Sequence, residues 1–71
     1  MGKDINVVVG RRVASLRGEM GLSQEKFAEL CNVHRTYIGA IERGEKSPTL
    51  STMEKIAKGL NVSMSKLFVD L

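Results

Sequence analysis

Apolar residues recur at intervals of three and four along most of the chain, the interval that places side chains on one face of an α-helix. Over residues 4–20 this stripe consists of Ile5, Val9, Val13, Leu16 and Met20. The valine run at 7–9 is β-branched and would suit a strand, but the regular spacing that follows it favours a helix. We therefore predict a first helix from about Asp4 to Met20.

Turn-forming and capping residues divide the next part of the chain into two short helical segments. Gly21 is a good left-handed residue at the end of the first helix, and Ser23 is a favourable N-cap for a second helix over 24–31. Asn32 can adopt the left-handed conformation that ends this second helix. A third helix is expected over about 34–43, after a tight turn.

Two further helices are predicted beyond the break at 44–48. Thr49 can cap a fourth helix, whose inner stripe is formed by Met53, Ile56, Ala57 and Leu60. Ser63 can cap a last short helix over about 63–69. No segment has the alternating pattern of a strand, so the predicted fold class is all-α, a compact five-helix domain.

The third helix has an unusual polar face. At about 100° per residue, Ile38 and Ile41 face the core and Tyr37 lies at its boundary. The opposite face carries Arg35, Thr36, Gly39, Ala40 and Arg43. A glycine inside a helix costs about 1 kcal/mol relative to alanine, so Gly39 needs an explanation.

Two explanations for Gly39 and Ala40 lead to different functions. Small residues could pack closely against another helix, a purely structural role. A helix in the major groove of DNA also needs little bulk where its backbone approaches the bases, and Arg35 and Thr36 could then reach base edges. Burying such polar neighbours unpaired would be costly, so we predict that Gly39 and Ala40 face solvent as positions of close approach, within a helix-turn-helix over 23–43.

Composition and charge narrow the class of protein. The 71 residues suffice for one domain, 1–71, and the net charge of +3 is only weakly basic. A single cysteine and a single histidine exclude an internal disulfide and argue against a metal site or other cofactor. The longest apolar run is too short for a signal peptide or a membrane span, and a free thiol fits a reducing compartment. We expect a cytoplasmic protein, and no nucleophile–base pair or phosphate-binding glycine loop suggests an enzyme.

The segments "LRGEMGLSQEKFAEL" and "VHRTYIGAIERGEKSPTLSTMEKIAKGLNV" resemble the phage-repressor, XRE-type helix-turn-helix family. The matching elements include "GLSQ", "IERG" and the Pro48–Thr49 pair, and they cover about residues 9–68. The "HRTYI" and "IERG" elements are most similar to the controller proteins of restriction–modification systems. The resemblance implies that the protein has a lambda-repressor-like fold. It also implies that the protein is a small dimeric regulator that binds operators.

The same resemblance implies which residues contact DNA. The base-contacting residues would be Arg35, Thr36, Tyr37, Arg43 and Lys46. The phosphate-contacting residues would be Gln24, Ser47, Thr49 and Ser51. Tyr37 could instead be a partly buried ring with a solvated hydroxyl, and Thr49 could serve only as a helix cap.

The resemblance also assigns a structural role to one pair of residues. Arg17 and Glu42 would form a largely buried ion pair between the first and third helices, and both border the apolar faces of their helices. Near the C-terminus, Met64, Leu67, Phe68 and Val69 exceed what one small domain can cover, although the core needs some of them, Leu67 among them. We predict a homodimer through this last helix.

The predicted function is therefore a sequence-specific regulator that binds palindromic double-stranded DNA operators as a homodimer and controls its own gene. A dimer bound to one operator would activate transcription, and a dimer bound to a second, weaker operator would repress the protein's own promoter. RNA polymerase is a further candidate partner. We expect no association with a membrane and no small-molecule effector. The alternatives are a phage-type repressor, a protein-binding or antitoxin-type module with the same fold, and an RNA-binding protein.

Overall fold

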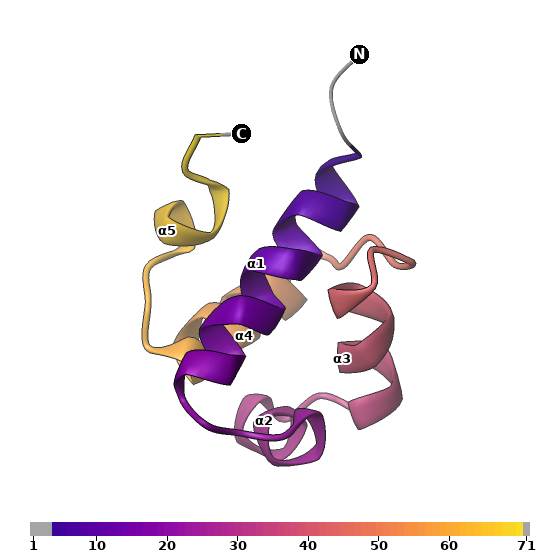
Figure 1. Ribbon diagram of the computed structural model, residues 1–71, viewed down its shortest axis with the longest axis vertical. Coiled ribbons are helices and arrows are strands. Elements are labelled where there is room, and N and C mark those ends of the chain that lie inside the picture. The colour runs from indigo at the N-terminus through magenta and orange to yellow at the C-terminus, as the bar shows by residue number, and fades with distance from the viewer. Residues whose placement is uncertain (1–3, 71) are drawn as a thin grey trace.

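Residues 4–70 are described in the computed structural model of the protein, and they form five α-helices (Figure 1). The helices are α1 (Ile5–Glu19), α2 (Gln24–Cys31), α3 (Arg35–Glu42), α4 (Leu50–Leu60) and α5 (Met64–Phe68). No strand occurs in this part of the chain. The prediction of an all-α, five-helix fold is confirmed, and the bounds predicted for the first three helices are within one residue of those observed.

Side-chain caps begin each helix, and the serine and threonine caps explain why the starts of α2, α4 and α5 could be predicted from the sequence. The hydroxyl groups of Ser23, Thr49 and Ser63 each accept a hydrogen bond from the backbone amide three residues further on. Asp4 caps α1 by accepting from the amide of Asn6 at 2.8 Å. Each cap satisfies an amide that the helix itself leaves without a partner.

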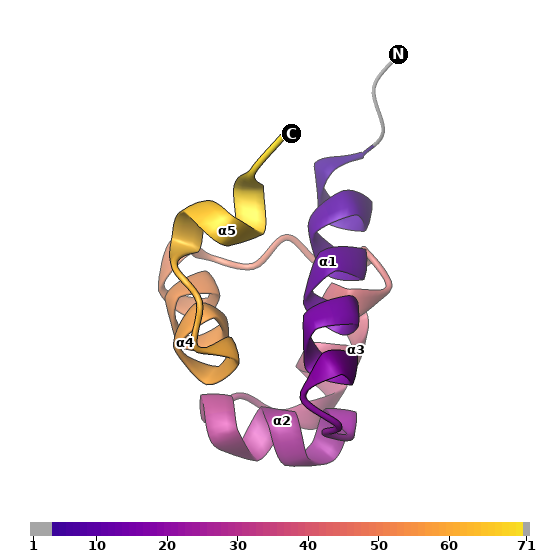
Figure 2. The same cartoon turned by 60° about the vertical axis from the view of Figure 1, so that its left-hand side comes forward.

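The helices form two sides joined by α2 at one end (Figure 2). The long helix α1 packs against α3, α4 and α5, and α2 packs against α3 and α4. The last helix, α5, packs against α1 and α4 and lies toward the end of the molecule opposite α2 (Figure 1). This arrangement places α2 and the beginning of α3 at the end of the molecule opposite α5 (Figure 1).

One apolar core fills the space between the helices. All five helices contribute fully buried large side chains, which are Val13, Phe27, Ile38, Ile41, Ile56 and Leu67. The two ends of the predicted α1 stripe do not reach this core, because Ile5 and Met20 remain 54% and 43% exposed. Within residues 4–70 every helix is too short or too polar to cross a bilayer.

Leu67 corrects one prediction about the C-terminal helix. Its side chain is fully buried in the core of its own chain, so its assignment to a dimer interface is wrong. Met64 and Phe68 are half-buried and pack against the same core, whereas Val69 is 51% exposed. A helix as short as α5 depends on such core contacts because five residues cannot hold a helix by themselves.

Two glycines allow helices to approach closely. A β-carbon on Gly10 in α1 would overlap the carbonyl oxygens of Ile41 and Glu42 on the backbone of α3. A β-carbon on Gly59 in α4 would overlap the sulfur of Cys31. Cys31 is buried there, and burial raises the pKa of its thiol to about 11. These contacts leave no room for larger residues at the α1–α3 and α2–α4 crossings.

Gly10→Ala is expected to lower the free energy of unfolding by about 1–3 kcal/mol, the range for overpacked sites. The new methyl group would press on the backbone of α3, which cannot move aside as a flexible side chain can. Gly18→Ala is the matched control, since a β-carbon there meets no atom within 4 Å, and it should stabilise the helix slightly. Urea unfolding measures both, and equal stability of the two variants would contradict the close α1–α3 packing.

Candidate nucleic-acid interface

Helices α2 and α3 are joined by a tight turn over 32–34. Asn32 ends α2 with a φ of 59°, in the left-handed region, as predicted. The amide of Val33 donates to the carbonyl oxygen of Ala28 at 3.0 Å, and the Val33 side chain packs against the core. The turn thus holds α3 against α2 in a helix-turn-helix arrangement.

His34 begins α3 and received no role from the sequence. Its Nδ1 atom accepts a hydrogen bond from the backbone amide of Thr36 at 3.1 Å, so His34 acts as the N-cap of α3. The only signal for this role in the sequence is the position of His34 directly before a predicted helix. Because the cap requires an unprotonated Nδ1, it fixes the tautomer of the ring at the start of the helix.

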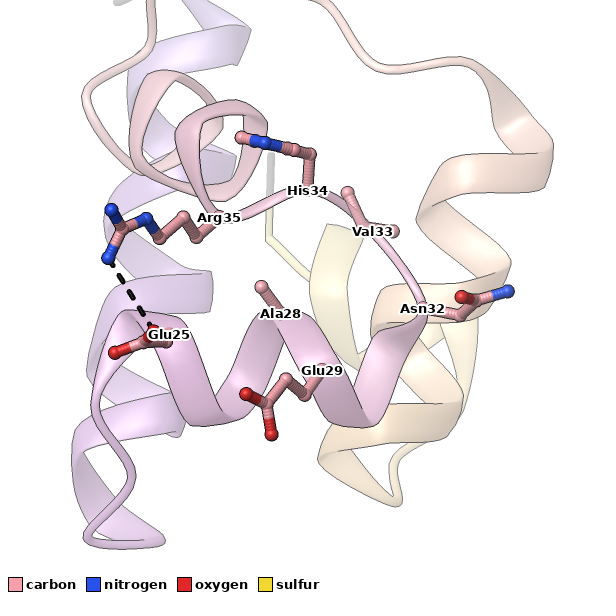
Figure 3. Close-up of a pocket in the computed structure, with 7 residues that line it drawn as sticks. All are labelled: Glu25, Ala28, Glu29, Asn32, Val33, His34 and Arg35. Atoms are coloured by element: carbon pink, nitrogen blue, oxygen red, sulfur yellow. Dashed lines mark ion pairs between the residues drawn. The ribbon is translucent and has the colours of Figure 1, made fainter.

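Arg35 and Thr36 form the exposed first turn of α3. The Arg35 side chain is 65% exposed, and its Nη1 lies 3.6 Å from a carboxylate oxygen of Glu25 on α2 (Figure 3). Thr36 is exposed as well. Tyr37 is half-buried and packs against the core, which agrees with the alternative structural role proposed for its ring.

Gly39 and Ala40 are both buried, so the prediction that they face solvent is wrong. Ala40 is a 7% exposed apolar residue. Gly39 is covered differently, because the atoms nearest a β-carbon there would be Nη1 of Arg43 at 3.1 Å and Oε1 of Gln24 at 3.4 Å. Two polar side chains, rather than another helix, therefore cover the backbone of Gly39.

Gly39 also lies in a shallow hollow of the surface between α2 and α3. The residues that line this hollow are Ser23, Gln24, Glu25, Arg35, Thr36, Gly39 and Arg43. We call it the α2–α3 hollow. It brings together four residues to which the sequence gave DNA contacts, namely Gln24, Arg35, Thr36 and Arg43.

The remaining predicted contact residues lie on and beside the loop that leads to α4. Lys46, Ser47, Thr49 and Ser51 are all exposed. The hydroxyl of Thr49 accepts from the amide of Thr52 at 3.1 Å, which confirms its alternative role as a helix cap. None of these four lines the α2–α3 hollow, so they form a separate group.

Arg43 is held at the start of this loop by Glu45. Its Nε and Nη2 atoms donate to the two carboxylate oxygens of Glu45 at 2.9 and 3.1 Å. These hydrogen bonds raise the pKa of the Arg43 guanidinium and lower that of the Glu45 carboxyl. Both side chains are more than half exposed, so the pair costs little to break.

Behind the hollow, Arg17 and Glu42 form the predicted ion pair. Nε and Nη2 of Arg17 donate to the two carboxylate oxygens of Glu42 at 2.7 and 3.0 Å, and the Glu42 side chain is only 4% exposed. Nη1 of Arg17 donates to the carbonyl oxygen of Leu22 at 2.8 Å. The hydrogen bonds to Glu42 raise the pKa of Arg17.

Gln24 joins this ion pair to the surface. Its side-chain amide donates to Oε1 of Glu42 at 2.8 Å, while its Oε1 lies over Gly39. The amide group is therefore held in one orientation at the N-terminus of α2. The sequence did not indicate this third member of the buried cluster.

Comparison with known proteins identifies the family to which the chain belongs. The model of the family described as helix-turn-helix matches residues 13–67. The chain belongs to the helix-turn-helix family. Among its relatives is Control protein C.SmaI of Serratia marcescens, which is 48% identical over 64 residues that cover 90% of this chain and 76% of the relative. Control protein C.BamHI of Bacillus amyloliquefaciens is 41% identical over 68 residues, covering 94% and 84% of the two chains.

Solved structures of helix-turn-helix proteins share the same fold. The restriction-modification controller protein C.AhdI of Aeromonas hydrophila matches with a TM-score of 0.87 and 38% identity, over 89% of this chain and 96% of that protein. The resemblance to restriction–modification controller proteins is thereby confirmed, and these relatives are regulators rather than enzymes. Within residues 4–70, no three metal-ligating side chains lie together.

Arg17→Met is expected to lower the free energy of unfolding by about 3–5 kcal/mol, because it leaves the Glu42 carboxylate buried without its cationic partner. The double variant Arg17→Met/Glu42→Leu removes the buried charge as well and should be more stable than the single variant. Arg35→Met is the matched control, since the Arg35–Glu25 pair is exposed. Urea unfolding measures all three, and equal losses for Arg17→Met and Arg35→Met would rule out the structural role of the buried pair.

Proposed function

We propose that the protein is a sequence-specific regulator of transcription that binds double-stranded DNA through α3. The observation that supports this most directly is the α2–α3 hollow, where Arg35, Thr36 and Arg43 lie around the backbone of Gly39, which is covered only by polar side chains. A recognition helix enters the major groove with its first residues toward the bases. The match to control proteins supports the same reading.

Gly39 allows the close approach that this binding requires. In the free protein, the ends of the Arg43 and Gln24 side chains lie above it. Arg43 could swing toward DNA because its partner Glu45 is exposed. Ala40, which is buried in the free chain, has no part in this contact.

The proposed base contacts are made by Arg35, Thr36, Tyr37, Arg43 and Lys46. Arginine pairs with O6 and N7 of guanine through two parallel hydrogen bonds, and threonine can contact a thymine methyl group. The exposed pairs of Arg35 with Glu25 and of Arg43 with Glu45 would be exchanged for bonds to DNA. Since such pairs contribute little stability, the exchange has a low cost.

The proposed phosphate contacts are made by Gln24, Ser47, Thr49 and Ser51. Gln24 is the first residue of α2, and a helix N-terminus favours anions through its free amides and its dipole. The three hydroxyl residues are exposed on or beside the loop before α4. Their contacts would fix the position of α3 in the groove without selecting a sequence.

The regulator would act as a homodimer through an apolar surface at the α5 end. We define this α1–α5 surface by Ile5, Met64, Phe68 and Val69. Ile5 and Phe68 line one groove, which α1 and α5 share with the end of α3, the loop before α4 and Met53 of α4. Ile5 and Val69 are each about half exposed. A second copy of the chain is the partner that we propose for this surface, because one short helix contacts too few base pairs to specify a site. Two-fold dimers of helix-turn-helix proteins bind two half-sites about 34–36 Å apart.

As a restriction–modification controller, the protein would regulate its own gene by concentration. A dimer on one operator would activate transcription through RNA polymerase, and a second dimer on a weaker operator would repress it. Relatives that are named control proteins support this proposal. A phage-type repressor is the second candidate, because an immunity repressor of Bacillus phage phi105 is 38% identical over 86% of this chain.

Selection of bound sequences from random duplex DNA tests the proposal. We expect a palindromic consensus with a guanine in each half-site that is lost in Arg35→Ala, and an affinity that falls steeply with salt as phosphate contacts release counterions. The same selection with single-stranded RNA is the control. If no duplex DNA is enriched, and if cells that carry the Arg35→Ala variant still regulate transcription normally, the result would favour a protein-binding module instead.

Gly39→Ala tests the close approach separately from folding. Its β-carbon would lie close only to Nη1 of Arg43, at the end of an exposed side chain, and at an ordinary contact distance of 3.4 Å from Oε1 of Gln24. The variant should therefore keep or slightly gain stability. The added methyl group should nevertheless weaken operator binding about tenfold, by holding the backbone off the bases. Gly18→Ala is the control with the same chemical change away from the hollow. Operator affinity equal to that of Gly18→Ala would exclude a close approach at Gly39.

A further inference from the structure

The carbonyl end of α5 is tied to α1 by a single side chain. Nη1 of Arg12 donates to the carbonyl oxygen of Val69 at 2.6 Å and to that of Leu67 at 3.2 Å. Arg12 lies in the middle of α1 and is half-buried. Among residues 4–70, no other side-chain hydrogen bond joins α5 to another helix.

Within residues 4–70, no backbone amide beyond α5 donates to the last carbonyl groups of this helix. After Phe68, Val69 adopts an extended conformation with φ −65° and ψ 139°, and Asp70 follows with a φ of 59°. The last carbonyl groups of a helix lack partners within the helix, and they carry its partial negative charge. The Arg12 guanidinium supplies a hydrogen-bond donor and the opposite charge at this end.

Apolar packing and the Arg12 hydrogen bonds fix different parts of α5. Leu67 is fully buried and anchors the middle of the helix to the core. Val69 is half exposed, so packing restrains it little, and the strong hydrogen bond to its carbonyl group sets its direction. Phe68 lies between these two fixed points and lines the groove that it shares with Ile5.

We propose that Arg12 is a positioning residue for the homodimer. By holding the carbonyl oxygens of Leu67 and Val69, it presents Phe68 and Val69 to a second copy of the chain in one defined arrangement. Without it, the last turn of α5 could fray, and association would first have to order that turn. This inference rests on the proposed homodimer through the α1–α5 surface.

The adjacent residue provides a matched control. Arg11 carries the same charge on the same helix, is exposed, and makes no side-chain hydrogen bond to any residue in the range 4–70. Arg12→Met and Arg11→Met therefore remove the same charge and nearly the same side-chain volume. Only the first removes the link to α5. Arg12→Lys keeps the charge but replaces the planar guanidinium with a single nitrogen.

Sedimentation equilibrium of the wild type and the three variants measures the dimer dissociation constant. We expect Arg12→Met to raise it about tenfold, the effect of losing charged hydrogen bonds, with Arg12→Lys in between and Arg11→Met close to the wild type. Far-UV circular dichroism at the same concentrations should show all four chains folded. In NMR spectra of Arg12→Met, amide shifts should be concentrated at 64–70 and absent from α2 and α3.

Three outcomes would overturn the inference, and they can be told apart. A wild type that stays monomeric at tens of micromolar would remove the homodimer itself. A dimeric wild type with equal dissociation constants for Arg12→Met and Arg11→Met would leave the dimer intact and reject the positioning role. Loss of helix content in Arg12→Met, or shifts spread over every helix, would show that Arg12 serves the fold as a whole.

Discussion

The shape of the α2–α3 hollow depends on the hydrogen bonds to the buried carboxylate of Glu42. This carboxylate accepts two hydrogen bonds from Arg17 on α1 and one from Gln24 at the start of α2. The last residue of α3 is therefore tied to two other helices by charged or polar bonds of defined direction. Apolar packing alone would permit small rotations of α3, whereas these bonds fix which of its side chains point outward. Since Gln24 also lies over Gly39, the same cluster shapes the floor of the α2–α3 hollow.

The two arginines that line the α2–α3 hollow each lie beside an exposed acidic residue. Arg35 lies beside Glu25, and Arg43 is bonded through both donors to Glu45 (Figure 3 shows the first pair). The net charge of the chain is only +3. A surface of this kind attracts phosphate weakly from a distance, so its affinity for DNA depends on the fit of individual contacts. A second recognition helix, supplied by a partner copy, would multiply such contacts at the far end of the fold from α5.

Some site geometry could be predicted because it follows from local spacing, and some could not. Ser23, Thr49 and Ser63 cap helices through amides three residues away. The pairing of Arg17 with Glu42 was instead implied by the family resemblance, and the helical wheel agreed with it because both residues border the apolar faces of their helices. The helical wheel placed Gly39 and Ala40 opposite Ile38 and Ile41, yet both are buried. The position of a residue on the helical wheel of α3 does not show which side chains of other helices cover it, as Gln24 of α2 covers Gly39. Leu67 was assigned in part to a dimer because composition cannot tell which apolar residue fills its own core.

The sequence by itself determined the number of helices, their ends and the family, because capping, turns and apolar periodicity act over a few residues along the chain. Only the tertiary structure decided that Gln24 joins the buried ion pair, and that Arg12 reaches the carbonyl groups of Leu67 and Val69. Arg12 is separated from Leu67 by 55 positions. The partners of a long polar side chain depend on how whole helices pack, so no local pattern contains them.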